Sequence, residues 1–238
     1  PDSAQADAEV VALGAEALQE LGIDGVSFDL SMPALLLGLI EGAIPEGERA
    51  ALIHALDRKD ASAVEELGGS VREQLAVMLR SAGPADRGLE LLSQVDFPEK
   101  IRGHFDRLKA SVDAIRERSP ELRLTIDPVD VRGWRYHTGL CVTVFSTTSR
   151  EELGRGGRYL AGQEAACGLT LRPQALLRAA PVPDARPRCY VPVDLARADL
   201  VELHGSGFAT VAALGRDQDP AAEAQRLRCT HVWRDGAA

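Results

Sequence analysis

Hydrophobic residues alternate with polar ones in two short stretches near the middle of the chain. The alternating positions are Leu122, Leu124 and Ile126 in the first stretch and Leu140, Val142 and Val144 in the second. Because successive side chains of a strand point to opposite faces, this period predicts two half-buried strands. Between them lies a polar segment, residues 130–139.

Residues 3–21 show the period of a helix, which Asp2 or Ser3 can cap and which Gly22 would follow. Its predicted apolar stripe consists of Val10, Gly14, Ala17, Leu18 and Leu21. Residues 26–30 then alternate as a short strand, and residues 32–40 return to the helical period. The chain therefore begins with mixed helix and strand.

From residue 45 to residue 118 the pattern is helical with frequent breaks. Ser70 and Glu73 have the spacing of a capping box, and Pro98 lies where a proline is best tolerated, at the start of a helix reaching to about residue 118. His54 and His104 lie in this region without a second metal ligand nearby, so both are interpreted as partly buried or surface histidines. We predict a helical insertion that packs on a neighbouring sheet.

The C-terminal part predicts a separate unit. A small-residue strand ends at Pro173 and precedes a helix, and the prolines Pro181, Pro183 and Pro187 then mark a linker. Beyond it, apolar strands at 189–193, 208–214 and 230–234 alternate with helices near 196–204 and 220–227. This alternation predicts βαβ units and a small parallel sheet. We expect one domain over residues 1–180 and a second over residues 186–238.

Composition narrows the class of protein. The 238 residues carry a formal net charge of −9 and only three lysines, which argues against an extended nucleic-acid surface. The four cysteines are scattered without a C-x-x-C pair, so neither zinc nor a disulfide framework is predicted. No apolar stretch is long enough for a transmembrane helix or a signal peptide, and we expect a soluble, cytoplasmic protein without a cofactor. The chain starts without methionine, so an upstream part is expected.

The polar segment combines two arginines, two aromatic rings, a histidine and two glycines, a mixture suited to a small-ligand pocket. A second cluster follows at residues 154–159, where glycines would let the backbone approach a ligand and Arg158 and Tyr159 offer a charge and a ring. The alternative interpretation is a basic hairpin with glycine turns. From the residues alone, both interpretations stay open.

Residues 132–139 resemble the histidine-binding motif of histidyl-tRNA synthetases, RGLDYYTG, and residues 156–159 resemble the GGRYD motif that follows it. The run Gln5-Ala6-Asp7-Ala8-Glu9-Val10 is similar to the ADAEV sequence after motif 2 of that family, so its motifs 1 and 2 are expected upstream of Pro1. The resemblance implies the fold class: α/β (α+β), a class II aminoacyl-tRNA synthetase-like mostly antiparallel sheet with the helical insertion and a small C-terminal α/β module.

Departures from the synthetase pattern point to a paralogue. Trp134 stands where the synthetase has leucine, Arg135 where it has aspartate, and His137 where it has the second tyrosine. In the stretch that aligns with motif 3, Ala175 replaces the arginine that contacts ATP and Gln174 replaces an acid. Alanine supplies neither charge nor donor for a phosphate, so the resemblance implies that the nucleotide chemistry is lost.

The resemblance also implies which residues form the pocket. Arg132 would pair with an anionic group, Tyr136 and Tyr159 would pack rings and donate hydroxyl hydrogen bonds, and His137 would make a hydrogen bond. Arg158 would be a further pocket residue with a structural role as the alternative. The glycines Gly139, Gly156 and Gly157 would provide backbone shape. No catalytic or metal-binding residue is expected.

The chain is similar to the histidyl-tRNA synthetase paralogue that serves as regulatory subunit of ATP phosphoribosyltransferase, the first enzyme of histidine biosynthesis. This implies a non-catalytic subunit that binds or senses histidine and forms a hetero-oligomer with the short-form catalytic subunit, with a homodimer of this chain inside it and no nucleic-acid or membrane partner. Two alternatives remain: an active histidyl-tRNA synthetase, and a small α/β enzyme whose basic pocket binds a phosphorylated or carboxylated substrate.

Overall fold

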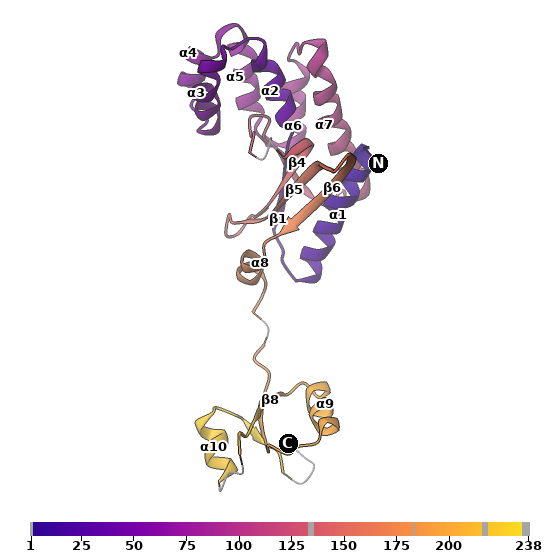
Figure 1. Cartoon of the computed structure of the whole chain (residues 1–238), viewed down its shortest axis with the longest axis vertical. Helices are drawn as coiled ribbons and strands as arrows, with labels where there is room; N and C mark the ends of the chain where they lie inside the picture. Colours follow the sequence, from indigo (N-terminus) through magenta and orange to yellow (C-terminus); the bar gives the residue numbers. More distant parts are fainter. Residues whose placement is uncertain (1, 133–135, 183, 216–218, 235–238) are drawn as a thin grey trace. The chain divides into compact units, whose positions relative to one another are not determined.

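The computed structural model describes residues 2–132, 136–182, 184–215 and 219–234. It divides into two compact units, Pro1–Pro181 and Val182–Ala238 (Figure 1). Trp134 and Arg135, which depart from the synthetase motif, and Pro183 of the predicted linker lie outside the described residues. The described helices include none that is long and apolar enough to cross a membrane.

A six-stranded sheet organises the first unit. Its strands are β1 Val26–Ser31, β2 Gly83–Pro84, β3 Arg123–Ile126, β4 His137–Ser146, β5 Glu152–Ala161 and β6 Glu164–Leu171. They lie in the order β2-β3-β1-β4-β5-β6, and every described neighbouring pair is antiparallel except β1 with β3. The predicted fold class, with a mostly antiparallel sheet, is confirmed.

The alternating residues face the same side of this sheet. Phe28 of β1 lies opposite Leu124 of β3 and Val144 of β4, and all three are buried. Hydrophobic side chains at matching registers therefore make one continuous apolar face. Helices cover this face.

The interpretation of residues 154–159 as glycine turns is wrong. These residues lie inside β5, which pairs with β4 on one side and with β6 on the other. Residues 146–151 make the turn before the strand, where Ser146 N and Arg150 N donate to Glu151 O and Ser146 O respectively. The glycines serve the close packing of strands instead of reversing the chain.

The first unit contains seven described helices before the last strands of the sheet and one after them. They are α1 Ala4–Glu20, α2 Pro33–Glu41, α3 Glu46–Asp57, α4 Ala61–Leu67, α5 Arg72–Ser81, α6 Ala85–Ser93, α7 Glu99–Arg118 and α8 Pro173–Ala179, with a 3₁₀ turn η1 at Gly69–Val71. In Figure 1, α1 and α7 lie side by side and pack on the sheet. The segment expected to be a helical insertion, residues 45–118, contains five helices, α3 to α7.

Two details of the helix predictions are wrong. Ala17 and Leu21 of the predicted stripe are exposed, and the buried side of α1 instead carries Ala4, Asp7, Ala8, Val11 and Leu18. Gly14 also lies on the buried side, and a Cβ there would come within 2.3 Å of the Leu169 side chain on β6. The capping box at Ser70 does not form, because η1 occupies that position and α5 begins without a side-chain cap.

The second unit is a three-stranded parallel sheet with one helix on each face. Its elements are β7 Arg188–Val191, α9 Arg197–Gly205, β8 Ala209–Ala212, α10 Pro220–Arg226 and β9 His231–Val232, with strand order β8-β7-β9. Cys189 and Val191 pack with Leu203 of α9, whereas Tyr190 packs with Ala224 of α10. The predicted βαβ units and parallel sheet are confirmed.

Candidate functional site

The segment between β3 and β4 holds Arg132 in a fixed pose. Its Nε and Nη2 donate to the two carboxylate oxygens of Asp130 at 2.8 and 2.7 Å, and its backbone N–H donates to Asp130 Oδ1 at 2.9 Å. Burial would raise the pKa of Asp130, but these hydrogen bonds lower it overall. Arg132, the expected anion partner, therefore pairs with a carboxylate of its own chain while about half of its side chain remains exposed.

Three rings meet where β4 begins. Tyr136 stacks on Tyr159 with ring centroids 5.2 Å apart and meets His137 edge-on at 5.1 Å. His137 and Tyr159 are cross-strand partners in β4 and β5, so the sheet register brings together residues of two separate motifs. The structure thus assembles an aromatic surface from three of the predicted site residues.

The hydrogen bond of His137 fixes its tautomer. Its Nδ1 lies 3.3 Å from the carbonyl oxygen of Arg158, which can only accept, so Nδ1 carries the proton and Nε2 is an acceptor. Burial lowers the pKa of His137, and the nearby Arg155 charge lowers it further. The ring is therefore neutral at pH 7.

The side chain of Arg158 is used inside the protein. It is 4% exposed, and its Nε and Nη2 donate to Asp7 Oδ1 of α1 at 3.0 and 2.5 Å. The other oxygen of Asp7 accepts from Arg107 Nη2 at 2.9 Å and from Ser111 Oγ at 3.0 Å, both on α7. This buried charge cluster joins α1, α7 and β5.

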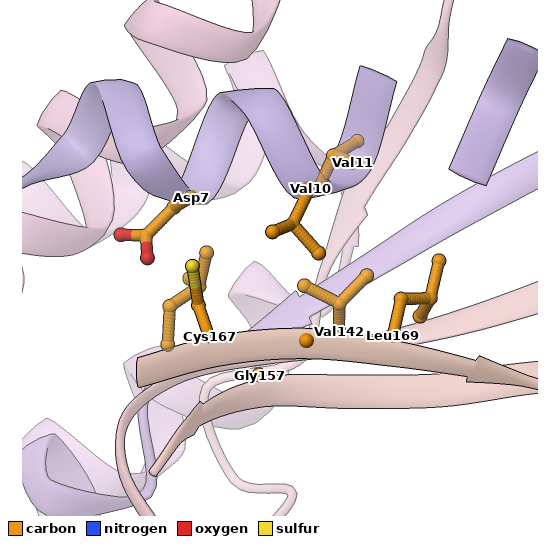
Figure 2. Close-up of a pocket in the computed structure, with 9 residues that line it drawn as sticks. Asp7, Val10, Val11, Val142, Gly157, Cys167 and Leu169 are labelled. Carbon is orange, nitrogen blue, oxygen red and sulfur yellow. The ribbon is translucent and has the colours of Figure 1, made fainter. Parts of the chain in front are cut away.

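Sequence reasoning missed Asp7, Arg107 and Ser111. The sequence did contain a signal for Asp7, because this acid lies on the apolar stripe of α1 between Ala4 and Ala8. Buried acids are almost always paired. Figure 2 shows Asp7 pointing from α1 toward Cys167 of the sheet, next to a cavity of about 10 Å³ with mostly apolar walls.

The glycines provide backbone shape. Gly157 has φ +147°, and a Cβ there would lie 2.4 Å from Leu140 O. A Cβ at Gly156 would lie 2.0 Å from Gly168 O of β6, and one at Gly139 would lie 3.2 Å from the Arg158 side chain. Side chains at Gly156 and Gly157 would push the strands apart, because the nearest atoms there are backbone.

A groove lies beside the aromatic surface and shares His137 with it. It has a volume of about 750 Å³ and is lined by α2, α3, α7 and the first residues of β4, including His137, Thr138 and Gly139. The volume is in the range of small-molecule sites. His104, interpreted from the sequence as a partly buried or surface residue, is half-buried in this groove.

Polar groups also lie on the sheet face opposite the apolar one. Burial raises the pKa of Asp29 to about 6, although Thr125 Oγ1 donates to its Oδ1 at 2.5 Å. Burial likewise raises the pKa of Cys141 to about 12, and Arg155 Nε is buried without a hydrogen-bond partner in the described chain. Asp29 and Arg155 were not predicted, although Asp29 occupies a polar position of the alternating strand β1.

The described residues offer no cluster of three or more His, Cys, Asp or Glu side chains that could hold a metal ion. All four cysteines are free, two of them buried.

Comparison with known proteins finds one protein family and several curated relatives that are similar to this chain. The profile of the family "Histidyl-tRNA synthetase" matches residues 1–176. The chain is 76% identical over its whole length to the ATP phosphoribosyltransferase regulatory subunit of Gluconobacter oxydans, covering 63% of that protein. It is 40% identical, over 97% of its length and 61% of the relative, to the same subunit of Paramagnetospirillum magneticum.

Solved structures share the fold at low identity. An ATP phosphoribosyltransferase regulatory subunit/histidyl-tRNA synthetase from Bacillus halodurans matches with a TM-score of 0.76 at 20% identity, over 98% of this chain and 65% of that one. The chain of an ATP phosphoribosyl transferase (HisG:HisZ) complex from Thermotoga maritima matches with a TM-score of 0.60 at 20% identity, over 71% of this chain and 61% of that one.

The present chain spans about three fifths of the length of the curated relatives that it matches. These relatives match nearly all of its residues, and the family profile matches most of the first unit. This chain belongs to the histidyl-tRNA synthetase family, and over nearly all of its length it is similar to curated ATP phosphoribosyltransferase regulatory subunits.

Proposed function

We propose that this chain belongs to a regulatory subunit that binds histidine and controls a short-form ATP phosphoribosyltransferase catalytic subunit in a hetero-oligomer, itself as a homodimer. The single observation that carries the proposal is the 76% identity over all 238 residues to a regulatory subunit of that enzyme. A solved structure with the same fold is that of an ATP phosphoribosyl transferase (HisG:HisZ) complex from Thermotoga maritima.

The described residues supply the groups that recognition of histidine would use. A guanidinium has five N–H donors, and Asp130 takes two of those of Arg132, which leaves three on a half-exposed side chain. Asp130 also orders the guanidinium in advance, which lowers the cost of binding a carboxylate. Tyr136 and Tyr159 offer a flat surface for an imidazole, and His137 Nε2 offers an acceptor.

The chain is proposed to have no activity of its own. Ala175, at the position of the family's ATP-contacting arginine, is 2% exposed on α8 and packs in the main core. The site is therefore occupied by a small apolar residue among hydrophobic neighbours. An arginine fork for a phosphate is missing there.

The test of binding is calorimetry with histidine on the full-length protein, alone and with the catalytic subunit. Arg132→Ala is expected to weaken binding roughly ten- to a hundredfold, because hydrogen bonds to charged groups contribute about 1.5 to 3 kcal/mol. Arg132→Lys keeps a charge beside Asp130 but loses the fork, so it separates recognition from stability. Arg87→Ala, at an exposed arginine, is the control.

The test of regulation is to mix the full-length protein with the short catalytic subunit of the same organism. Light scattering is expected to show a joint assembly, and catalytic activity is expected to fall as histidine is added. Coupling of about 1 to 3 kcal/mol would change affinity roughly 5- to 150-fold. Two separate species, with activity equal and histidine-insensitive with or without this chain, would overturn the proposal.

A further inference from the structure

The two arginines in residues 154–159 lie on opposite faces of the sheet. Arg155 and Arg158 are three positions apart in β5, and successive side chains of a strand alternate between faces. Arg158 is buried against Asp7 of α1. Arg155 lies in register with Thr143 of β4, which in turn lies in register with Asp29 of β1. Arg155 therefore belongs to the polar face, and its side chain is 25% exposed.

The backbone next to Arg155 on this face carries no side chains. Gly157 is the next residue of β5 on the polar face, and it lies in register with Gly168 of β6. A Cβ at Gly157 would lie 3.1 Å from Nδ1 of His137. A Cβ at Gly168 would meet only the ring of Tyr159 among the described residues, at 3.7 Å. Gly157 and Gly168 thus form a glycine floor between the guanidinium of Arg155 and the rings of His137 and Tyr159.

The positive charge of Arg155 acts on the groups that flank the glycine floor. It helps to lower the pKa of His137, and it opposes the rise in pKa that burial causes at Cys141. Cys141 is the β4 partner of Gly157. Because Coulomb interactions strengthen at short range and away from water, an anion on the floor would be attracted to this charge.

The guanidinium of Arg155 is oriented but keeps unused donors. Its Nη2 donates to Glu152 Oε2 at 2.9 Å, whereas its Nε is buried without a hydrogen-bond partner in the described chain. A guanidinium has five N–H donors, so this single bond leaves most of its capacity unused. A buried donor without an acceptor is costly, and a ligand that supplies an acceptor removes that cost.

The carboxylates around Arg155 do not neutralise the arginines there. Glu152 also accepts from Arg172 Nη2 at 2.5 Å, and its charge raises the pKa of Arg132. Asp130 is held by the bidentate pair with Arg132. Three arginines therefore share two carboxylates, which leaves one positive charge for an anionic ligand.

We propose that Arg155 is a further ligand-binding residue, which holds the carboxylate of an amino acid lying on the glycine floor. The ring of the ligand packs against Tyr159 and His137, and the donors of Arg155 add to those of Arg132. Arg155 and Tyr159 are four strand residues apart, roughly 13 Å, which leaves room for one small molecule between charge and ring. The inference rests on the histidine binding proposed above and names a residue that recognises the carboxylate.

The test compares two ligands that differ in the carboxylate. Calorimetry on the full-length protein measures the binding of histidine and of histamine, which is the same molecule without its carboxylate. Arg155→Gln is expected to weaken histidine binding roughly ten- to a hundredfold and to leave histamine binding no weaker than in the parent. Arg155→Lys keeps the charge but loses the planar fork, so its loss should be smaller.

Two further variants separate the ligand contact from stability. Arg172→Gln is the matched control, because Arg172 pairs with the other oxygen of Glu152 and its side chain is 56% exposed. It should bind both ligands as the parent does. Gly168→Val places a side chain on the glycine floor, where a Cβ has room, and should abolish binding of both ligands. Thermal unfolding shows that each variant is folded.

The outcomes distinguish this inference from the proposed function. Equal losses of histidine and histamine binding in Arg155→Gln would mean a structural role and refute the inference. Unchanged histidine binding in both Arg155 variants, or unchanged binding in Gly168→Val, would refute it while histidine binding by the parent still stands. If the parent binds no histidine, the proposed function fails and the inference fails with it.

Discussion

Gly157 is a residue of β5 whose backbone leaves no room for a side chain. Its φ of +147° is strained for any L-residue, and the nearest atoms to a Cβ would be the backbone of Leu140 and Cys141 at 2.4 and 2.9 Å. Backbone atoms in the middle of a sheet cannot move aside as a flexible side chain can. The position therefore combines a conformational and a steric demand for glycine.

Gly157→Ala is expected to lower the free energy of unfolding by roughly 2 kcal/mol or more. Gly103 offers a matched control inside α7, because a Cβ there meets nothing within 4 Å. Gly103→Ala should raise stability by about 0.5 to 1 kcal/mol, since alanine favours the helix. Urea unfolding of both variants measures the difference, and equal effects would refute the steric explanation.

Asp29 links stability to pH. Burial raises its pKa from 3.8 to about 6, so between these values the folded protein holds a proton that the unfolded chain releases. The free energy of unfolding should fall as pH rises through this window and stay lower above it. The cost of the buried charge is therefore present at pH 7 and absent near pH 4.

Asp29→Asn should remove this dependence and raise stability at pH 7 by roughly 1 to 3 kcal/mol, while the Thr125 hydroxyl can still donate to the amide oxygen. Denaturant unfolding between pH 4 and pH 7 is the measurement. Asp24→Asn, at an exposed aspartate, is the control and should change little. A variant whose stability falls with pH as steeply as the parent would exclude Asp29 as the cause.

At the scale of elements, the charge cluster around Asp7 joins three pieces of the chain. Asp7 of α1 is 4% exposed and pairs with Arg158 of β5 and Arg107 of α7. Asp2 also lies 3.0 Å from Arg107 and 3.3 Å from Arg158, but its side chain is 60% exposed. A buried charge that loses its buried partner is costly, although the intact pair itself contributes little. Loss of Asp7 should therefore loosen α1 from the sheet.

Asp7→Ala is expected to lower the free energy of unfolding by about 3 to 5 kcal/mol. Glu9 on the same helix pairs with Arg118 at 2.7 Å, but both side chains are about half exposed, so Glu9→Ala should cost less than about 1 kcal/mol. Thermal unfolding of the two variants compares a buried pair with an exposed one. Similar losses would mean that burial of the cluster has little energetic weight.

At the scale of the whole molecule, the regulatory function proposed above predicts that the protein lacks amino-acid activation. We expect full-length protein to show no histidine-dependent exchange of pyrophosphate into ATP in the presence of magnesium. The physical reason is Ala175, buried where the synthetase family carries an arginine. Exchange at a rate comparable to a synthetase assayed in parallel would contradict the regulatory function.

Local patterns in the sequence determined the elements of this protein. Alternation at residues 122–126 and 140–144 depends only on neighbours two positions apart, so it predicted β3 and the centre of β4. Prolines and glycines marked the start of α7 and the end of α1 for the same local reason. The βαβ order of the C-terminal residues was enough to predict a parallel sheet, because parallel strands need a crossover.

Only the tertiary structure decided which side chains meet. Arg158 and Asp7 are 151 positions apart, and they pair because α1 packs against β6, the neighbour of β5 in the sheet, which no local pattern encodes. The same is true of Tyr136, His137 and Tyr159, whose contact depends on the register between β4 and β5. A sequence specifies periodicity within an element, whereas the partner of a buried charge or ring depends on how distant elements pack.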